Sequence, residues 1–303
     1  GRRGTHGSIF AQHVLSSGAV DPAWPVNGRS LATSFPGAYL PQIVSDGAGG
    51  AIVIWLQLEG GFDRIRTQHL LASGLVDPAW PANGRAVSLQ SGGNEDPQLV
   101  PCGSGGAIIT WTDGRRGFYD IYAQHVLATG VVDPRWPMDG RLLSLAVFQT
   151  VIPQIAPDGS GGAIVIWRER RYNGYDVFSQ HVLAGGDTDA LWPVGGRPIC
   201  EAVGDQDSPQ LVSDGAGGGL VTWQDHRSAN YDIYAQHVLP SGAAAPGWPV
   251  DGRALCTAAG DQTVPQLVPD GTGGAIAIWW DQRNGPTSDL YAQRTPVSVP
   301  VPT

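Results

Sequence analysis

The chain has 303 residues and a net charge of −9, and it is rich in Gly (43), Pro (24) and Trp (11). With 42% hydrophobic residues it is too apolar for a disordered chain. All 18 basic residues are Arg and they form no basic stripe, which excludes a nucleic-acid binder or a binder of anionic membrane surfaces. No apolar run approaches the roughly 20 residues of a membrane helix, so no membrane insertion is expected.

Five landmarks recur every 56 residues, which shows that the chain is built of repeats. A Gln-His pair, a Trp that ends an apolar run, a Trp-Pro pair, a Gly-Arg pair and a Pro-Gln pair keep one register in all five copies. The Gln-His pairs begin at residues 12, 68, 124, 180 and 236, and the Trp residues that end the apolar runs are Trp55, Trp111, Trp167, Trp223 and Trp279.

Each copy divides into four strand-like segments. The first is a Pro-Gln-Leu-Val run such as 209–212, and a glycine-rich turn at 213–218 joins it to the second, 219–223, which ends on Trp. The third, 232–239, alternates β-forming residues, and the fourth is 252–256. Glycines allow the positive φ angles that a tight hairpin needs, and no stretch shows helical periodicity. We predict four strands per copy and almost no helix.

The predicted fold class is all-β: a five-bladed β-propeller of four-stranded blades that spans residues 1–295 as one domain, followed by a Pro-rich linker or tail at 296–303. The chain opens on a third-type strand at 8–15 and closes on first and second types at 265–279, so the two ends are expected to share a blade and close the ring. A further third-type strand at 289–293 is surplus. Either it or the N-terminal strand must be displaced or pair elsewhere. The alternative is an open repeat array cut from a longer protein.

The motifs WxDxR, YDIYAQ, WPxxGR and PQLVxDGxGGAIxxW together resemble the repeats of secreted bacterial β-propeller proteins, a mostly uncharacterised family. The SxDGxGG turn also faintly resembles the Asp-box of sialidase-type propellers, but here the aromatic residue follows the Asp by nine positions. The resemblance covers residues 1 to about 295. It implies a propeller and a secreted or cell-surface location, and it says almost nothing about activity.

An acid-x-Arg pattern follows the second-strand Trp in four copies, whereas the first copy has Leu-Gln-Leu-Glu at 56–59. One interpretation is a set of charges and hydrogen-bond donors that face a ligand on the variable loops. The other is a set of salt bridges that join neighbouring blades. With the aromatic residues nearby, the predicted ligand-binding residues are Asp113, Arg115, Tyr119, Glu169, Arg171, Tyr172, Asp225, Arg227, Trp280, Asp281 and Arg283.

Other repeated side chains are expected to be structural. The His of each Gln-His pair would lie far from its counterparts in other blades, so we expect buried, hydrogen-bonded histidines and predict no metal and no cofactor. The Trp of each Trp-Pro pair is expected to plug the core. Cys102, Cys200 and Cys256 are expected to be small apolar fillers beyond disulfide reach of one another.

These patterns favour a non-catalytic extracellular binding or interaction module, lectin-like in one form, with a carbohydrate or protein ligand on the variable loop face. One alternative is a structural or adhesive component of a cell-surface or filamentous assembly, with self-assembly through the spare edge strand. The other is a glycosidase-type enzyme, which needs two carboxylates about 5 to 10 Å apart. Glu95, Asp96, Glu201, Asp205 and Asp207 lie in variable loops and could supply such a pair, but no enzyme activity is predicted.

Overall fold

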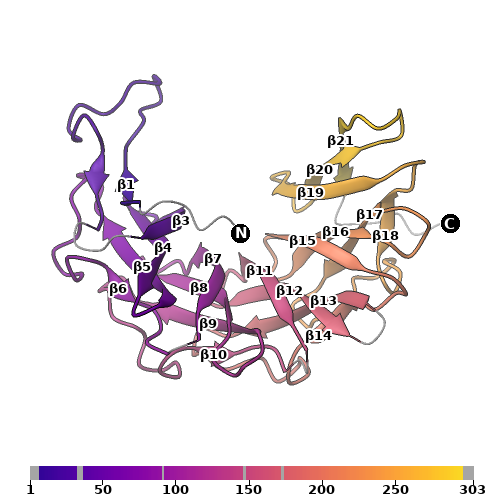
Figure 1. Ribbon diagram of the computed structural model, residues 1–303, viewed down its shortest axis with the longest axis horizontal. Helices are drawn as coiled ribbons and strands as arrows, with labels where there is room; N and C mark the ends of the chain where they lie inside the picture. The colour runs from indigo at the N-terminus through magenta and orange to yellow at the C-terminus, as the bar shows by residue number, and fades with distance from the viewer. Residues whose placement is uncertain (1–6, 33–36, 91, 146–147, 172–173, 296–303) are drawn as a thin grey trace. The chain divides into compact units, whose positions relative to one another are not determined.

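The computed structural model describes residues 7–32, 37–90, 92–145, 148–171 and 174–295. Within these ranges the protein consists of strands and connecting loops, with no helix (Figure 1). The predicted all-β class is therefore confirmed. Accordingly, the described part of the chain contains no helix that could cross a lipid bilayer. The proposed linker at 296–303 lies outside the described residues.

The strands form antiparallel sheets that follow the repeat, in two compact units: Gly1–Gly117 with Tyr122–Arg141, and Phe118–Ile121 with Leu142–Thr303. The first unit holds the pair β1 (Phe10–Ala11) and β2 (Arg29–Ser30), the sheet β3 (Ala38–Ser45), β4 (Ala51–Glu59), β5 (Phe62–Leu70) and β6 (Arg85–Ala86), and most of the sheet β7 (Asn94–Pro101), β8 (Ala107–Asp113), β9 (Asp120–Val126) and β10 (Arg141–Leu142). The second unit holds the sheet β11 (Thr150–Pro157), β12 (Ala163–Arg171), β13 (Gly174–Val182) and β14 (Arg197–Cys200), the sheet β15 (Gln206–Ser213), β16 (Gly219–Asp225), β17 (Asp232–Val238) and β18 (Arg253–Cys256), and the three strands β19 (Gln262–Pro269), β20 (Ala275–Asp281) and β21 (Asp289–Thr295).

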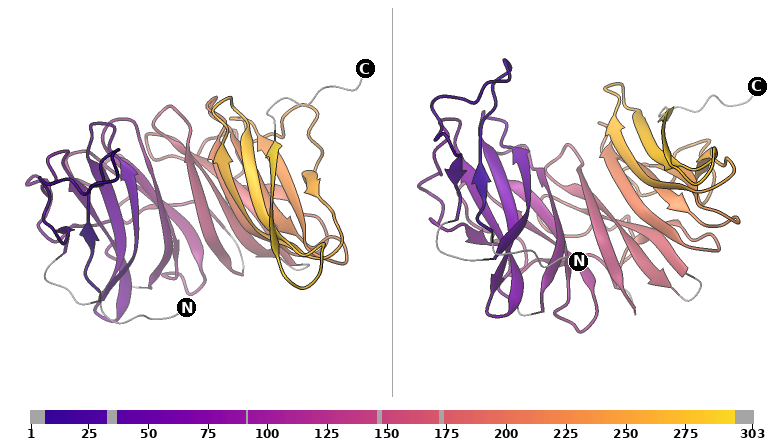
Figure 2. Two further views of the ribbon diagram at one scale, coloured as in Figure 1. Left: turned by 90° about the horizontal axis from the view of Figure 1, so that it is seen from above. Right: turned by 45° about the horizontal axis from the view of Figure 1, so that its top comes forward.

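Consecutive sheets pack with their first strands together. In the second unit β11 lies against β15, and β15 lies against β19 (Figure 2). In the first unit β3 contacts β7. Each four-stranded sheet therefore presents its first strand to the first strand of the next copy within the unit.

The turn between the first and second strands explains why four of the five copies carry Asp-Gly-x-Gly-Gly, the second having Cys102 in place of the Asp. Asp214 Oδ1 accepts hydrogen bonds from the amides of Ala216 (2.7 Å) and Gly218 (2.9 Å). Gly215 and Gly217 have φ angles of 76° and 90°, a region that other residues rarely adopt. The Asp therefore closes the hairpin by accepting hydrogen bonds from backbone amides, and the glycines supply the positive φ angles that were predicted for the turn.

A backbone feature that the sequence pattern does not signal recurs at the start of every first strand. The residue two before the Pro-Gln glutamine has a positive φ in each copy although it is never Gly, and the pairing of the first and second strands shifts register at the same place. These residues are Leu40, Asp96, Ile152, Ser208 and Val264. A repeated β-bulge therefore bends each first strand and re-aims the residues that precede it.

The Trp that ends the second strand is the centre of each core. Trp55, Trp111, Trp167 and Trp223 are fully buried and Trp279 is 3% exposed. The Gly of the following Gly-Arg pair packs on this ring. A Cβ on Gly84 would come within 2.7 Å of Trp55 Cη2, and Gly84 has a φ of +77°. The Trp55 ring therefore leaves no room for a side chain at position 84, so only Gly fits there.

Gly84→Ala is expected to destabilise the protein by about 2 to 3 kcal/mol, because it adds overpacking against Trp55 to the strain of a positive φ. Gly103→Ala is the matched control: Gly103 has the same φ of +77°, and a Cβ there would meet no atom within 4 Å. Urea denaturation of both variants isolates the steric contribution. Equal losses of unfolding free energy would show that Trp55 makes no steric demand on this site.

The predicted sharing of one blade by the two ends of the chain is wrong. Among the described strands, β1 pairs only with β2, and β20 pairs with β19 and β21. The strand β21 thus takes the third-strand place that the N-terminal strand was expected to fill. A seven-residue loop joins β21 to β20, and such a short loop closes at far lower entropic cost than a pairing between the ends of the chain.

Candidate functional site

The acid-x-Arg motif forms a clamp that is satisfied within the protein. Arg227 donates from Nε and Nη2 to the two oxygens of Asp225 (2.9 and 2.7 Å) and from Nη2 to the Asp251 carbonyl (2.7 Å), and its guanidinium stacks on Tyr234 at 3.9 Å. Nη2 also approaches Cys200 Sγ, at 3.2 Å, on the last strand of the preceding copy. The clamp therefore ties β16 to β14.

The same geometry recurs at two of the other three motifs. Arg115 stacks on Tyr122 at 4.0 Å and donates to Ser88 Oγ of the preceding copy at 3.2 Å. Arg283 stacks on Tyr291 at 3.8 Å and approaches Cys256 Sγ at 3.0 Å. These contacts occupy the charged side chains that were predicted to face a ligand, and a ligand role for them stays a prediction.

The third copy departs from this pattern because its acid is Glu169. Glu169 Oε2 accepts from the Trp167 indole at 2.9 Å, and Oε1 lies 2.6 Å from Arg171 Nη2. The longer side chain alters the clamp: Arg171 Nε is buried without a hydrogen-bond partner, and the guanidinium stacks on Phe178 at 4.5 Å. The Arg171 side chain is 40% exposed, compared with 23% for Arg227. This copy therefore has the looser clamp.

A second carboxyl, Asp176, lies directly across from Glu169 in the β12–β13 pairing. Asp176 is 1% exposed, and its Oδ1 has no hydrogen-bond partner. The counterpart in the next copy, Asp232, accepts hydrogen bonds from Ser228 Oγ (2.8 Å) and Asn230 Nδ2 (3.2 Å). Asp176 Oδ1 thus lacks a donor, whereas both oxygens of its counterpart accept a hydrogen bond.

Burial and nearby acids raise the pKa of both carboxyls. Burial, with the negative charge of Glu201 next in size, raises the pKa of Asp176 to about 6. Burial also raises the pKa of Glu169, although the Trp167 indole and the Arg171 charge act in the opposite direction. The pair therefore places a carboxyl whose raised pKa favours the protonated form beside a second carboxyl that an arginine contacts, an arrangement suited to acid–base catalysis.

The pair lies close to the surface. Glu201, whose charge acts on both carboxyls, is exposed, and its amide donates to Asp251 Oδ1 at 2.9 Å. Arg171, which contacts Glu169, is itself partly open to solvent. Glu169 is therefore buried in contact with a side chain that itself reaches solvent.

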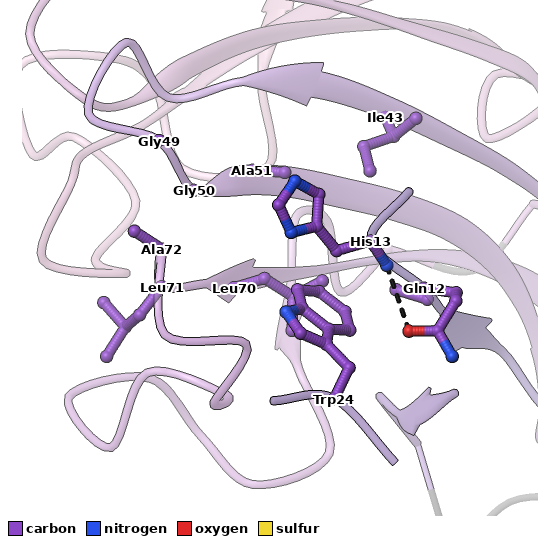
Figure 3. Close-up of a pocket in the computed structure, with 11 residues that line it drawn as sticks. Gln12, His13, Trp24, Ile43, Gly49, Gly50, Ala51, Leu70, Leu71 and Ala72 are labelled. Atoms are coloured by element: carbon purple, nitrogen blue, oxygen red, sulfur yellow. Dashed lines mark hydrogen bonds between the residues drawn. The ribbon is translucent and has the colours of Figure 1, made fainter. Parts of the chain in front are cut away.

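The first unit contains a pocket of about 170 Å³ at the end of β1 (Figure 3). His13 and Trp24 form one wall with ring centroids 5.9 Å apart, and His13 Nδ1 lies 2.8 Å from Asp21 Oδ2. Trp24 Nε1 is buried without a hydrogen-bond partner, whereas Trp80 Nε1 donates to the Ala128 carbonyl at 3.0 Å. None of the residues that line the pocket is an acid, so it offers no carboxylate pair.

The predicted site residues therefore fall into distinct environments. In each described acid-x-Arg pair the acid and the arginine contact one another. Trp280 is 53% exposed on β20. Tyr119 is half-buried, and its carbonyl accepts a hydrogen bond from the Thr150 hydroxyl. Tyr172 lies outside the described residues. Sequence analysis missed Asp176 because it belongs to the repeated strand motif. The only signal was Glu in place of Asp at position 169 of its partner strand.

The other repeated side chains are structural. His69, His125, His181 and His237 are buried and hydrogen-bonded, as predicted, whereas His13 is partly exposed. The Trp-Pro tryptophans Trp80, Trp136, Trp192 and Trp248 are buried as predicted. The described residues contain no group of His, Cys, Asp and Glu that could hold a metal ion.

Comparison with known proteins gives remote likenesses only. No family model and no curated protein match the chain. Three similar solved structures are an endo-arabinase from Bacteroides thetaiotaomicron (11% identity, TM-score 0.44, covering 85% of this chain and 94% of that one), a Hadza microbial sialidase (12%, 0.45, 85% and 56%) and an alpha-L-arabinofuranosidase from Coprinopsis cinerea (10%, 0.41, 84% and 89%).

These comparisons correct the expectation of a non-catalytic, lectin-like binding module, because the similar structures with a named activity are carbohydrate-cleaving enzymes. With TM-scores below 0.5 and identities near 10%, the likenesses transfer no residue and no activity to this chain. The chemistry of its own side chains must carry any assignment.

Proposed function

We propose that the protein is a glycosidase-type hydrolase whose catalytic carboxyls are Glu169 and Asp176. The observation that carries the proposal is the buried cross-strand pair itself, with an Asp176 oxygen that has no partner. Directly opposed residues on antiparallel strands point to the same face with Cβ atoms about 5 Å apart. The two carboxyls therefore project from the same face of the sheet, as the paired carboxyls of a retaining glycosidase must in order to flank one bond.

The environments of the two carboxyls assign their roles. Asp176, with its raised pKa and no donor at Oδ1, is the general acid that protonates the glycosidic oxygen as the leaving sugar departs. Glu169, held by the Trp167 indole and Arg171, is the carboxylate that attacks the anomeric carbon. Water then hydrolyses the glycosyl–enzyme bond, and Asp176 takes the proton from that water. The substrate reaches the pair beside the partly exposed Arg171 side chain, which keeps its contact with Glu169.

We further propose that the 56-residue copies are blades of a β-propeller and that the protein acts outside the cell. Four-stranded antiparallel sheets that meet through their first strands support the blade assignment. A carbohydrate substrate supports the location, since polymeric glycans are mostly extracellular. Small-angle scattering of the purified chain tests the architecture.

The first test is hydrolysis of a panel of aryl α- and β-glycosides and polysaccharides, with release of reducing ends as the readout and Asp176→Asn protein as the blank. We expect turnover that rises to a maximum at mildly acidic pH and falls above about pH 6, as Asp176 loses its proton. Turnover must also fall at lower pH, once Glu169 is protonated. Folded protein without turnover on the panel, or turnover that Asp176→Asn leaves intact, would refute the assignment.

A further inference from the structure

The glycine-rich turns contain a socket built for a negative charge. In the third copy, Asp158 Oδ1 accepts from the amides of Ser160 (2.6 Å) and Gly162 (2.9 Å), and Oδ2 lies 2.9 Å from His181 Nε2. His181 Nδ1 is in turn 3.0 Å from Asp189 Oδ2. Two backbone amides and one imidazole therefore surround the two oxygens of a single acid. The first and fourth copies repeat these contacts at Asp46 and Asp214.

The second copy has the same turn but carries Cys102 in place of the acid. The Cys102 amide donates to the Gly106 carbonyl at 3.1 Å, as the Asp158 amide does to the Gly162 carbonyl at 3.2 Å. Gly103 and Gly105 have φ angles of 77° and 80°, like their counterparts in the third copy. The socket is therefore preserved around a side chain that is shorter than Asp and has no oxygen.

Cys102 belongs to a Cys–His–Asp cluster. Cys102 Sγ lies 3.2 Å from His125 Nε2 and 3.1 Å from Ser104 Oγ, and His125 Nδ1 lies 2.9 Å from Asp133 Oδ2. His125 is buried, whereas Cys102 is partly exposed and open to a small reagent. Asp133 orients the imidazole so that Nε2 faces the sulfur. The prediction that Cys102 is an apolar filler is therefore wrong.

We propose that Cys102 is an oxidation site for small peroxides and that its sulfinate product takes the place of the missing Asp in the socket. The Cys102 thiolate attacks one peroxide oxygen, the O–O bond breaks, and the leaving oxygen takes up a proton to become water, which leaves a sulfenic acid. A second peroxide oxidises that sulfur to the sulfinate and again releases water. A sulfinate has one negative charge shared by two oxygens, as a carboxylate has. Its oxygens match the acceptor positions that face the Ser104 and Gly106 amides and His125.

The electrostatics of the cluster favour the reactive form of the sulfur. Burial alone would raise the pKa of Cys102, but hydrogen bonds from His125 and Ser104 outweigh it and lower the pKa to about 6. Burial raises the pKa of the other two thiols, Cys200 and Cys256. The three cysteines of one chain thus offer one thiolate and two thiols, and the thiolate is the form that peroxides oxidise.

The test is exposure of the native full chain to hydrogen peroxide at neutral pH, with peptide mapping of all three cysteines by mass spectrometry. Cys102 is expected to gain one and then two oxygen atoms at a rate at least about 10-fold above that of Cys256, the other partly exposed cysteine. Rates within a factor of about two, or a faster Cys256, would overturn the proposal.

The stability of two substituted proteins tests the socket separately from reactivity. Cys102→Asp restores the acid of the other copies and is expected to melt at a higher temperature than wild type, whereas Cys102→Ser, which has no charge, is not. Wild type oxidised to the sulfinate is expected to shift in the same direction as Cys102→Asp. A lower melting temperature for either the Asp variant or the oxidised protein would contradict the proposal that the socket stabilises a negative charge at position 102.

Discussion

Glu169→Gln is expected to lower kcat by about 10³-fold with little change in KM, because it removes the attacking carboxylate and keeps the volume of the side chain. The amide can still accept the Trp167 indole hydrogen bond, so the core beneath it is retained. Steady-state kinetics on the best substrate from the panel measure this effect. A loss confined to KM would place Glu169 in binding and remove it from the chemical step.

Asp225→Asn is the matched control, since Asp225 occupies the same place in the next copy, between the Trp223 indole and an Arg clamp. It also removes a buried charge that pairs with an arginine, so its effect on stability should resemble or exceed that of Glu169→Gln. Its effect on kcat should be small. If both variants lose activity in proportion to their unfolding, the acid-x-Arg motifs are structural in every copy and the hydrolase proposal fails.

The repeat itself made most of the secondary structure predictable. The third segment, predicted at 232–239, is β17 at Asp232–Val238, and the fourth, predicted at 252–256, is β18 at Arg253–Cys256. Because five copies share one register, the hydrophobic pattern and the glycine turns can be recognised far more reliably than in a single copy. The first strands begin earlier than predicted, at Gln206 in the fourth copy, because pairing resumes on the far side of the bulge at Ser208.

The missed features depend on single departures from the repeat. Asp176 and Asp232 stand at the same position, and Asp232 accepts from a hydroxyl and an amide in the loop before it, whereas Asp176 Oδ1 has no hydrogen-bond partner. Cys102 stands in the column of turn acids, but its charge state depends on the His125 ring, which folding alone brings within 3.2 Å. The residues shared by all copies thus predict the strands and turns. A copy differs in its chemistry where one shared residue is replaced while the residues around it stay the same as in the other copies.

Trp279→Ala is expected to destabilise the protein by about 3 to 5 kcal/mol, since it empties a large volume in the cluster with Ile233 and Ala277. It also removes the indole that donates to Asp281 Oδ2 at 2.9 Å, so the buried acid loses one donor and keeps its contacts to Arg283 and to the Cys256 thiol. Chemical denaturation followed by fluorescence measures the change in the free energy of unfolding.

The neighbouring residue provides the control, because Trp280→Ala removes the same side chain from the same strand. Trp280 is 53% exposed, whereas Trp279 is 3% exposed, so successive residues of β20 sample the two faces of one sheet. Trp280→Ala is expected to change the free energy of unfolding by less than about 0.5 kcal/mol, as most surface substitutions do. A cost for Trp280→Ala comparable to that for Trp279→Ala would mean that the outer face of β20 is covered in solution. Burial of the repeated Trp would then no longer distinguish the core face of this sheet from its outer face.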